Sequence, residues 1–169
     1  MIGHATIGRE GRMWGRRRRT TGSISVAAAD LRGDALVASS SSQTKDGFWI
    51  SNGAYEVLAA GASDRELGAA VLRMLDASRT GVRTPNLRRG PSPFAPVLEA
   101  LGLRTWSAYA RGLLHVHVER EDALVRVTAS RNGGSREGLV GSAEPVAVLE
   151  RPGDDALGAA IRAAFARCS

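Results

Sequence analysis

The sequence predicts an α+β protein in which helices pack on a mainly antiparallel β-sheet. Two observations lead to this fold class. Short apolar stretches that alternate with polar residues fill two blocks, residues 23–60 and 113–129, as expected for strands with one buried face. An apolar strand followed at once by a helix also occurs twice, with the related helix sequences ELGAAV at residues 66–71 and ALGAAI at residues 156–161. This internal repeat predicts two similar strand-then-helix units.

The length of 169 residues fits one domain. No apolar run approaches the roughly 20 residues that a helix needs to cross a bilayer. Cys168 is the single cysteine, so no intrachain disulfide can form, and we expect a cytoplasmic protein. Residues 1–22 are rich in Gly and Arg and show no periodicity. We therefore expect a disordered basic segment at residues 1–22, followed by a single domain at residues 23–169.

The first part of this domain consists of β-type segments. We expect strands at residues 23–28, 35–42, 47–51 and 54–60. Asn52-Gly53 lies between the last two segments. Because both residue types tolerate the positive φ of a type I′ turn, this dipeptide predicts a hairpin.

A capping-box pattern at Ser63 and Glu66 predicts a helix that continues to about Ser78. The apolar residues of this helix recur at helical spacing and should form the face that lies on the sheet: Leu67, Ala70, Val71, Met74 and Leu75. Gly68 and Gly158 occupy equivalent places in the repeat, although glycine inside a helix costs about 1 kcal/mol relative to alanine. Their presence predicts a close approach of each helix backbone to the sheet.

A proline-rich loop is expected at residues 80–96, followed by short helices at residues 97–102 and 105–111. Residues 113–119 and 123–129 alternate as two strands of a hairpin, and a turn at Glu121-Asp122 would pair Val116 with Val127. The opposite face then carries His115, His117, Arg126 and Thr128. A strand at residues 145–149 and a helix at residues 154–167 complete the chain.

No catalytic, metal-binding or cofactor-binding constellation emerges from these elements. His115 and His117 share a strand face, but the domain offers no further histidine, and the nearby Arg126 would repel a cation. The serines lack a G-x-S-x-G context. The carboxylates at residues 119–122 lie at a turn, where acidic residues are common. We therefore expect no enzyme, no cofactor and no small-molecule substrate.

The order of these motifs resembles the immunity proteins of bacterial contact-dependent growth inhibition (CDI) systems, the CdiI family, over about residues 39–168. The most telling parts are the pattern Ser63-x-x-Glu66-Leu67-Gly68 that leads to Ser78-Arg79, and the closing helix with Leu157-Gly158 and Ala164-Phe165. The resemblance implies a cytoplasmic antitoxin without membrane contact. Such an antitoxin binds and neutralises the C-terminal toxin domain of a cognate CdiA-type effector, often a nuclease.

The net charge of +6 influences what kind of toxin surface is expected. Residues 1–34 hold seven arginines against three acidic residues, so the rest of the chain carries only +2. A slightly basic body is a poor phosphate mimic, which predicts that it covers an acidic metal-binding cleft or binds away from the active site. Part of the partner-binding surface is expected at His115, His117 and Arg126. The alternative is a nucleic-acid-binding module that uses the arginine run at residues 16–19.

Overall fold

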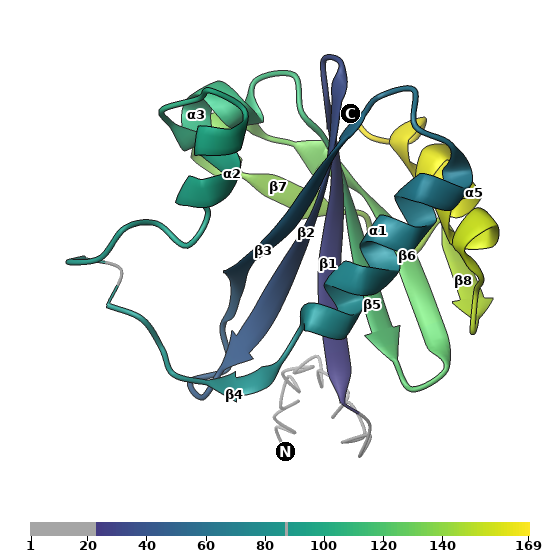
Figure 1. Ribbon diagram of the computed structural model, residues 1–169, viewed down its shortest axis with the longest axis horizontal. Helices are drawn as coiled ribbons and strands as arrows, with labels where there is room; N and C mark the ends of the chain where they lie inside the picture. The colour runs from purple at the N-terminus through teal and green to yellow at the C-terminus, as the bar shows by residue number, and fades with distance from the viewer. Residues whose placement is uncertain (1–22, 87) are drawn as a thin grey trace, which may run out of the picture.

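The computed structural model describes residues 23–86 and 88–169, in which one mainly antiparallel sheet has helices packed on it (Figure 1). The α+β class predicted from the sequence is therefore confirmed. The segment at residues 1–22, expected to be disordered, lies outside the described residues. The strands are β1 (Ile24–Arg32), β2 (Ala35–Thr44), β3 (Trp49–Ala59), β4 (Thr80–Val82), β5 (Leu114–Glu121), β6 (Leu124–Asn132), β7 (Leu139–Gly141) and β8 (Ala147–Glu150).

The central sheet has the strand order β3-β2-β1-β5-β6. Strands β7 and β8 both pair antiparallel with β6, and the short β4 pairs parallel with β2. The helices are α1 (Asp64–Ala77), α2 (Ala95–Ala100), α3 (Trp106–Ala110), α4 (Gly134–Glu137) and α5 (Asp154–Phe165). Figure 1 shows α1 and α5 beside each other on the sheet, whereas α2 and α3 gather around a different part of it.

The main apolar core lies between the sheet and helices α1 and α5. The predicted capping box is present, since the amide of Glu66 donates to Ser63 Oγ (3.2 Å) and the amide of Ser63 donates to Glu66 Oε2 (2.7 Å). The apolar face predicted for α1 is buried as a whole, and α5 contributes four more buried side chains: Leu157, Ile161, Ala164 and Phe165. Burial of this stripe therefore fixes both helices on one face of the sheet.

The two helix glycines make a contact that differs from the predicted one. A Cβ added at Gly68 would overlap the backbone carbonyl of Asp154, and one added at Gly158 would overlap that of Asp64. The close approach is thus between α1 and α5, at the first turn of each helix, and not between a helix and the sheet. Because the contact is reciprocal, the two copies of the sequence repeat dock on each other.

Asn52-Gly53 does not form the predicted hairpin. Strand β3 continues through this dipeptide, where three residues (52–54) lie opposite Ser40 of β2, so the pair is a bulge. The Asn52 side chain donates to Ser40 Oγ (2.9 Å) and Ser42 Oγ (3.0 Å), and Gly53 adopts a φ of 84°. The positive φ that the sequence indicated is present, but it accommodates extra residues within a strand.

The β5–β6 hairpin has a register that differs from the predicted one by two residues. Val118 pairs with Val127, and Glu119 pairs with Arg126. The turn is Asp122-Ala123 rather than Glu121-Asp122, because Asp122 adopts the left-handed conformation (φ 53°) and both strands extend one pair nearer the tip. Since the shift is even, each side chain stays on its predicted face.

A second, smaller core lies on the opposite face of the sheet. Strand alternation directs Leu36 and Ala38 into the main core and Val37 to the other side, where α2 and α3 cover it. The residues buried in this second core are Val37, Val97, Tyr109 and Leu113. Helices α2 and α3 cover only part of this face, and none of the described helices lies over its β5–β6–β8 part (Figure 1).

Candidate partner-binding surface

The three residues expected in the partner-binding surface share one face of the β5–β6 hairpin. His117 pairs with Thr128 and Glu119 with Arg126, and directly opposite residues in antiparallel strands project to the same side. His115 follows the same alternation two residues before His117. This is the face that α1 and α5 do not cover. The structure thus brings the three residues onto one side, but their environments differ.

His115 takes part in a buried polar cluster. Its Nδ1 lies 2.6 Å from Oδ1 of Asp30, and the hydroxyl of Tyr109 donates to the other oxygen of Asp30 (2.5 Å). Asp30 is only 3% exposed. Burial and the charge of Asp30 raise the pKa of Tyr109 far above its usual range, so the phenol remains a hydrogen-bond donor. The cluster fastens α3 to strands β1 and β5.

This Asp–His pair does not extend into a catalytic triad within the described part of the chain. There, no serine, threonine or cysteine side chain hydrogen-bonds the imidazole of His115. Arg32 strengthens the same contact by donating to the backbone carbonyls of Ala108 (3.1 Å) and Tyr109 (3.2 Å). Sequence reasoning missed Asp30, although a lone acidic residue inside the apolar strand AAADL was a signal of a buried polar partner.

His117 is half-buried beside this cluster. Burial lowers the pKa of His117, the neighbouring His115 lowers it further, and Glu119 opposes both effects. Among residues 23–86 and 88–169, no group of three or more His, Cys, Asp or Glu side chains is placed to hold a metal ion. The geometry therefore favours a neutral imidazole in a polar strand face.

Arg126 lies between two glutamates. Its Nη1 is 3.1 Å from Glu121 Oε2 and 3.6 Å from Glu119 Oε1, and its side chain is 35% exposed. Strand β8 continues this face, because Arg126 pairs with Val148 and Leu124 pairs with Glu150. We call the following residues the open hairpin face: Glu119, Glu121, Leu124, Arg126, Val148 and Glu150. The open hairpin face contains both exposed aliphatic and charged side chains.

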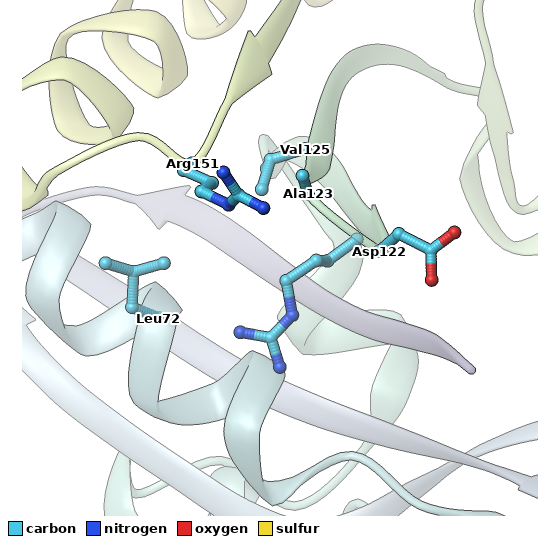
Figure 2. Close-up of a pocket in the computed structure, with 6 residues that line it drawn as sticks. Leu72, Asp122, Ala123, Val125 and Arg151 are labelled. Carbon is cyan, nitrogen blue, oxygen red and sulfur yellow. The ribbon is translucent and has the colours of Figure 1, made fainter. Parts of the chain in front are cut away.

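A hollow of about 420 Å³ lies on the other side of the same hairpin (Figure 2). Its lining residues are Leu72, Arg120, Asp122, Ala123, Val125 and Arg151. Arg120 is paired with Asp76 (2.8 Å), and the Asp122 carboxylate in Figure 2 points away from Leu72 and Arg151. The hollow brings two guanidinium groups together over an apolar floor, and its lining holds no acid–base pair suited to proton transfer.

The described helices include none that is long and apolar enough to span a membrane. The sequence matches the model of the family described as CdiI, CDI immunity protein, over residues 27–168. No curated protein matches the chain.

Two solved structures share the fold. A protein of unknown function, NMB0488 from Neisseria meningitidis, is 19% identical with a TM-score of 0.71, and the match covers 89% of this chain and 98% of that chain. The CdiA-CT/CdiI toxin and immunity complex from Yersinia pseudotuberculosis is 16% identical with a TM-score of 0.68, and the match covers 87% and 98% of the two chains. Because the family model spans most of the sequence and includes both copies of the helix repeat, the chain belongs to the CdiI family of CDI immunity proteins.

Proposed function

We propose that this protein acts in the cytoplasm as an antitoxin that binds and neutralises the C-terminal toxin domain of a cognate CdiA-type effector, a nuclease. The observation that carries the proposal is the family match over residues 27–168. The similar fold of a toxin and immunity complex supports a toxin as the partner. In this proposal the protein acts by occupying a surface of the toxin and performs no chemistry of its own.

The arrangement of the buried polar groups agrees with a binding role. Asp30 and His115, an acid–histidine pair, hold α3 on the sheet, with both carboxylate oxygens already engaged. The hairpin beyond them presents charged and aliphatic side chains on a face that none of the described helices covers. Such a rigid, partly apolar strand surface suits recognition of a protein partner.

We place the toxin contact on the open hairpin face. Of the three residues that the sequence suggested, Arg126 belongs to this face, whereas His115 faces inward toward Asp30 and is 17% exposed. His117 lies at the border of the open hairpin face, one residue pair away from Glu119 and Arg126. The contact is therefore centred on Arg126 and its neighbour Val148, which is 51% exposed.

The test begins with co-purification of this protein with the toxin domain encoded immediately upstream. Titration calorimetry then measures affinity and stoichiometry in moderate and in high salt. Stoichiometric binding in both conditions, together with inhibition of the toxin, is the expected result. Failure to bind, combined with salt-sensitive retention on DNA, would instead favour the alternative of a nucleic-acid-binding module.

The location of the contact is tested by Val148→Arg. A bulky charge at this position beside Arg126 should weaken toxin binding by about tenfold or more, because it is left desolvated in the contact. Val140→Arg is a matched control, since Val140 is a similarly exposed valine (41%) on the other short strand beside β6. Equal effects of the two substitutions would remove the open hairpin face from consideration.

A further inference from the structure

The hollow beside the hairpin tip lies between three separate elements (Figure 2). Leu72 belongs to α1, Arg151 follows β8, and the other lining residues belong to the tip of the β5–β6 hairpin. The Arg151 amide donates to the Ala123 carbonyl (2.7 Å), which ties the end of β8 to the hairpin tip. The volume of about 420 Å³ suits a small molecule, since sites for such ligands measure about 300–1,000 Å³.

Apolar side chains form the floor of this hollow. Val125 is only 1% exposed, and Leu72 packs against the main core. Small-molecule sites commonly combine such an apolar lining with a few polar groups that fix the orientation of the ligand. The carboxylate of Asp122 points away from Leu72 and Arg151 (Figure 2). The polar groups of the hollow are therefore mainly the guanidinium groups of Arg120 and Arg151.

The side chain of Arg151 has no ion-pair or hydrogen-bond partner within residues 23–86 and 88–169. Its backbone adopts a φ of 42°, which is uncommon for a residue with a long side chain and which the following Pro152 restricts further. Backbone strain of this kind clusters at ligand sites, where the surrounding structure maintains it. An arginine thus occupies a turn position that glycine would fit more easily, and its guanidinium lines the hollow.

Arg120 supplies the second guanidinium of the hollow. Its Nη1 donates to Asp76 Oδ1 (2.8 Å), and its side chain is 29% exposed. This contact holds the guanidinium in place but uses only one of its several N–H donors. Because the planar fork of a guanidinium matches the oxygens of a phosphate, two such groups from different elements can bind one anion.

We propose that this hollow binds a phosphate group, with Arg120 and Arg151 as the donors. Two guanidinium groups suit phosphate better than carboxylate, because a phosphate monoester carries about two negative charges at neutral pH and offers more acceptor oxygens. The apolar floor then contacts the rest of a small phosphorylated molecule, such as a mononucleotide. The hollow and the open hairpin face lie on opposite sides of the hairpin, so this site goes beyond the proposed function and does not require the toxin.

Titration calorimetry of the full chain tests the site with inorganic phosphate, adenosine monophosphate and adenosine as probes. We expect inorganic phosphate to bind with a Kd of about 1 mM, adenosine monophosphate to bind about tenfold more tightly, and adenosine not to bind. Equal affinities for the two phosphate compounds would support the site and identify free phosphate as its ligand. Adenosine binding as tightly as its monophosphate, or no binding of either phosphate compound below about 10 mM, would overturn the proposal.

Arg151→Gln removes the unpaired guanidinium and should weaken the binding of adenosine monophosphate about tenfold or more. Arg111→Gln is the matched control, because Arg111 is an exposed arginine at the end of α3 that does not line the hollow. The control should keep its affinity within about twofold. The same affinity in both variants would contradict the assignment of Arg151.

Arg151→Gly separates ligand binding from folding. Glycine adopts a positive φ without strain, which offsets the greater freedom that it gives the unfolded chain, so the Tm should stay within about 3 °C of the unsubstituted protein. Binding of adenosine monophosphate should fall as far as in Arg151→Gln, and full affinity would overturn the proposal. If neither phosphate compound binds but Arg151→Gln weakens toxin binding, the hollow takes an acidic side chain of the toxin and the proposal also fails.

Discussion

Asp30 is the residue on which the attachment of the second core depends. Its carboxylate joins β1 to Tyr109 of α3 and to His115 of β5, three segments that are distant in sequence. Removing either side of this cluster leaves a buried polar group without its hydrogen bond. Such a group lowers the stability of the fold, because no water replaces the missing bond. The stability of this region therefore rests on a polar group more than on apolar area.

Replacing Asp30 by alanine tests this dependence. Asp30→Ala leaves the Tyr109 hydroxyl and the His115 imidazole without their acceptor, and we expect the free energy of unfolding to fall by about 3 kcal/mol. Asp34→Ala, at the exposed turn after β1, should change it by less than about 0.5 kcal/mol. Urea unfolding followed by circular dichroism measures both. Equal small effects would show that the cluster contributes little to stability.

His117 gives the fold a pH dependence on the acidic side of neutrality. Burial and His115 lower the pKa of His117, so the unfolded chain takes up this proton at a higher pH than the folded chain does. The stabilising contribution is therefore complete above the unfolded pKa of about 6.5 and is lost as the pH falls below it. His117→Gln should flatten the fall in unfolding free energy as the pH drops below about 6.5. An identical slope in the variant would contradict this assignment.

The site could be predicted from the sequence only in part at the residue scale. Alternation placed His115, His117 and Arg126 on one face, because a period of two does not depend on the exact register. The partners of these residues do depend on it, and Glu150 and Val148 come from a strand more than twenty residues further along the chain. No local pattern joins β8 to β6, so the carboxylate-rich character of the face appeared only in the structure.

At the scale of elements, the contact between α1 and α5 places the strictest requirement on the sequence, because the two helix backbones approach each other closely. Arg162 of α5 pairs with Asp64 (2.7 Å) at the start of α1, next to the point where Gly158 approaches the Asp64 backbone. Only the absence of a side chain permits this distance. The glycines therefore offset their poor helix propensity by the packing that they allow.

A Gly68→Ala substitution separates these two effects. In an isolated helix it would stabilise by about 1 kcal/mol, but here the new Cβ overlaps the Asp154 carbonyl, and we expect a loss of about 2 kcal/mol or more. Ala159→Gly at an exposed position of α5 should lose about 1 kcal/mol from propensity alone. Thermal unfolding measures both variants. A stabilised Gly68→Ala would show that the helices can move apart at no cost.

Elements defined by local chemistry were predicted best. The capping box and helical spacing of α1 are short-range signals. The short helix expected at residues 105–111 also has a local signal, since Thr105 Oγ1 accepts from the Ala108 amide at the start of α3. The register of β5 and β6 was wrong because two turns were compatible with the same alternation. Only the left-handed backbone at Asp122 distinguishes them. The hairpin predicted at Asn52-Gly53 was wrong for a related reason, since a bulge and a hairpin both use a residue with positive φ.

At the scale of the whole molecule, residues 23–86 and 88–169, which the structure describes, form two apolar cores. The buried apolar residues of the described chain run from Val26 to Phe165. We therefore expect a variant that begins at Ser23 to unfold cooperatively, with a free energy of unfolding within about 1 kcal/mol of the full chain. It should also bind the toxin with unchanged stoichiometry. A loss of both properties would show that residues 1–22 belong to the domain.

The net charge of the chain does not describe the charge of any single face. The +6 of the chain is a sum over all surfaces, and seven of its arginines lie in residues 1–34. On the open hairpin face, for example, the Arg126 guanidinium lies beside the carboxylates of Glu119 and Glu121. The expectation of an acidic toxin cleft followed from the sum. That expectation, and its alternative of a contact away from the active site, stay predictions.

The bulge at Asn52-Gly53 also connects the edge strand β3 to helix α1. Beyond anchoring β3 to β2, the Asn52 side chain lies 3.1 Å from the Ala77 carbonyl at the last turn of α1. The Asn52 side-chain amide thus connects β3, β2 and α1 through hydrogen bonds and not through apolar contacts. A shift of β3 by one residue would move the Asn52 side chain away from these acceptors, so the amide favours the observed register of β3 against β2.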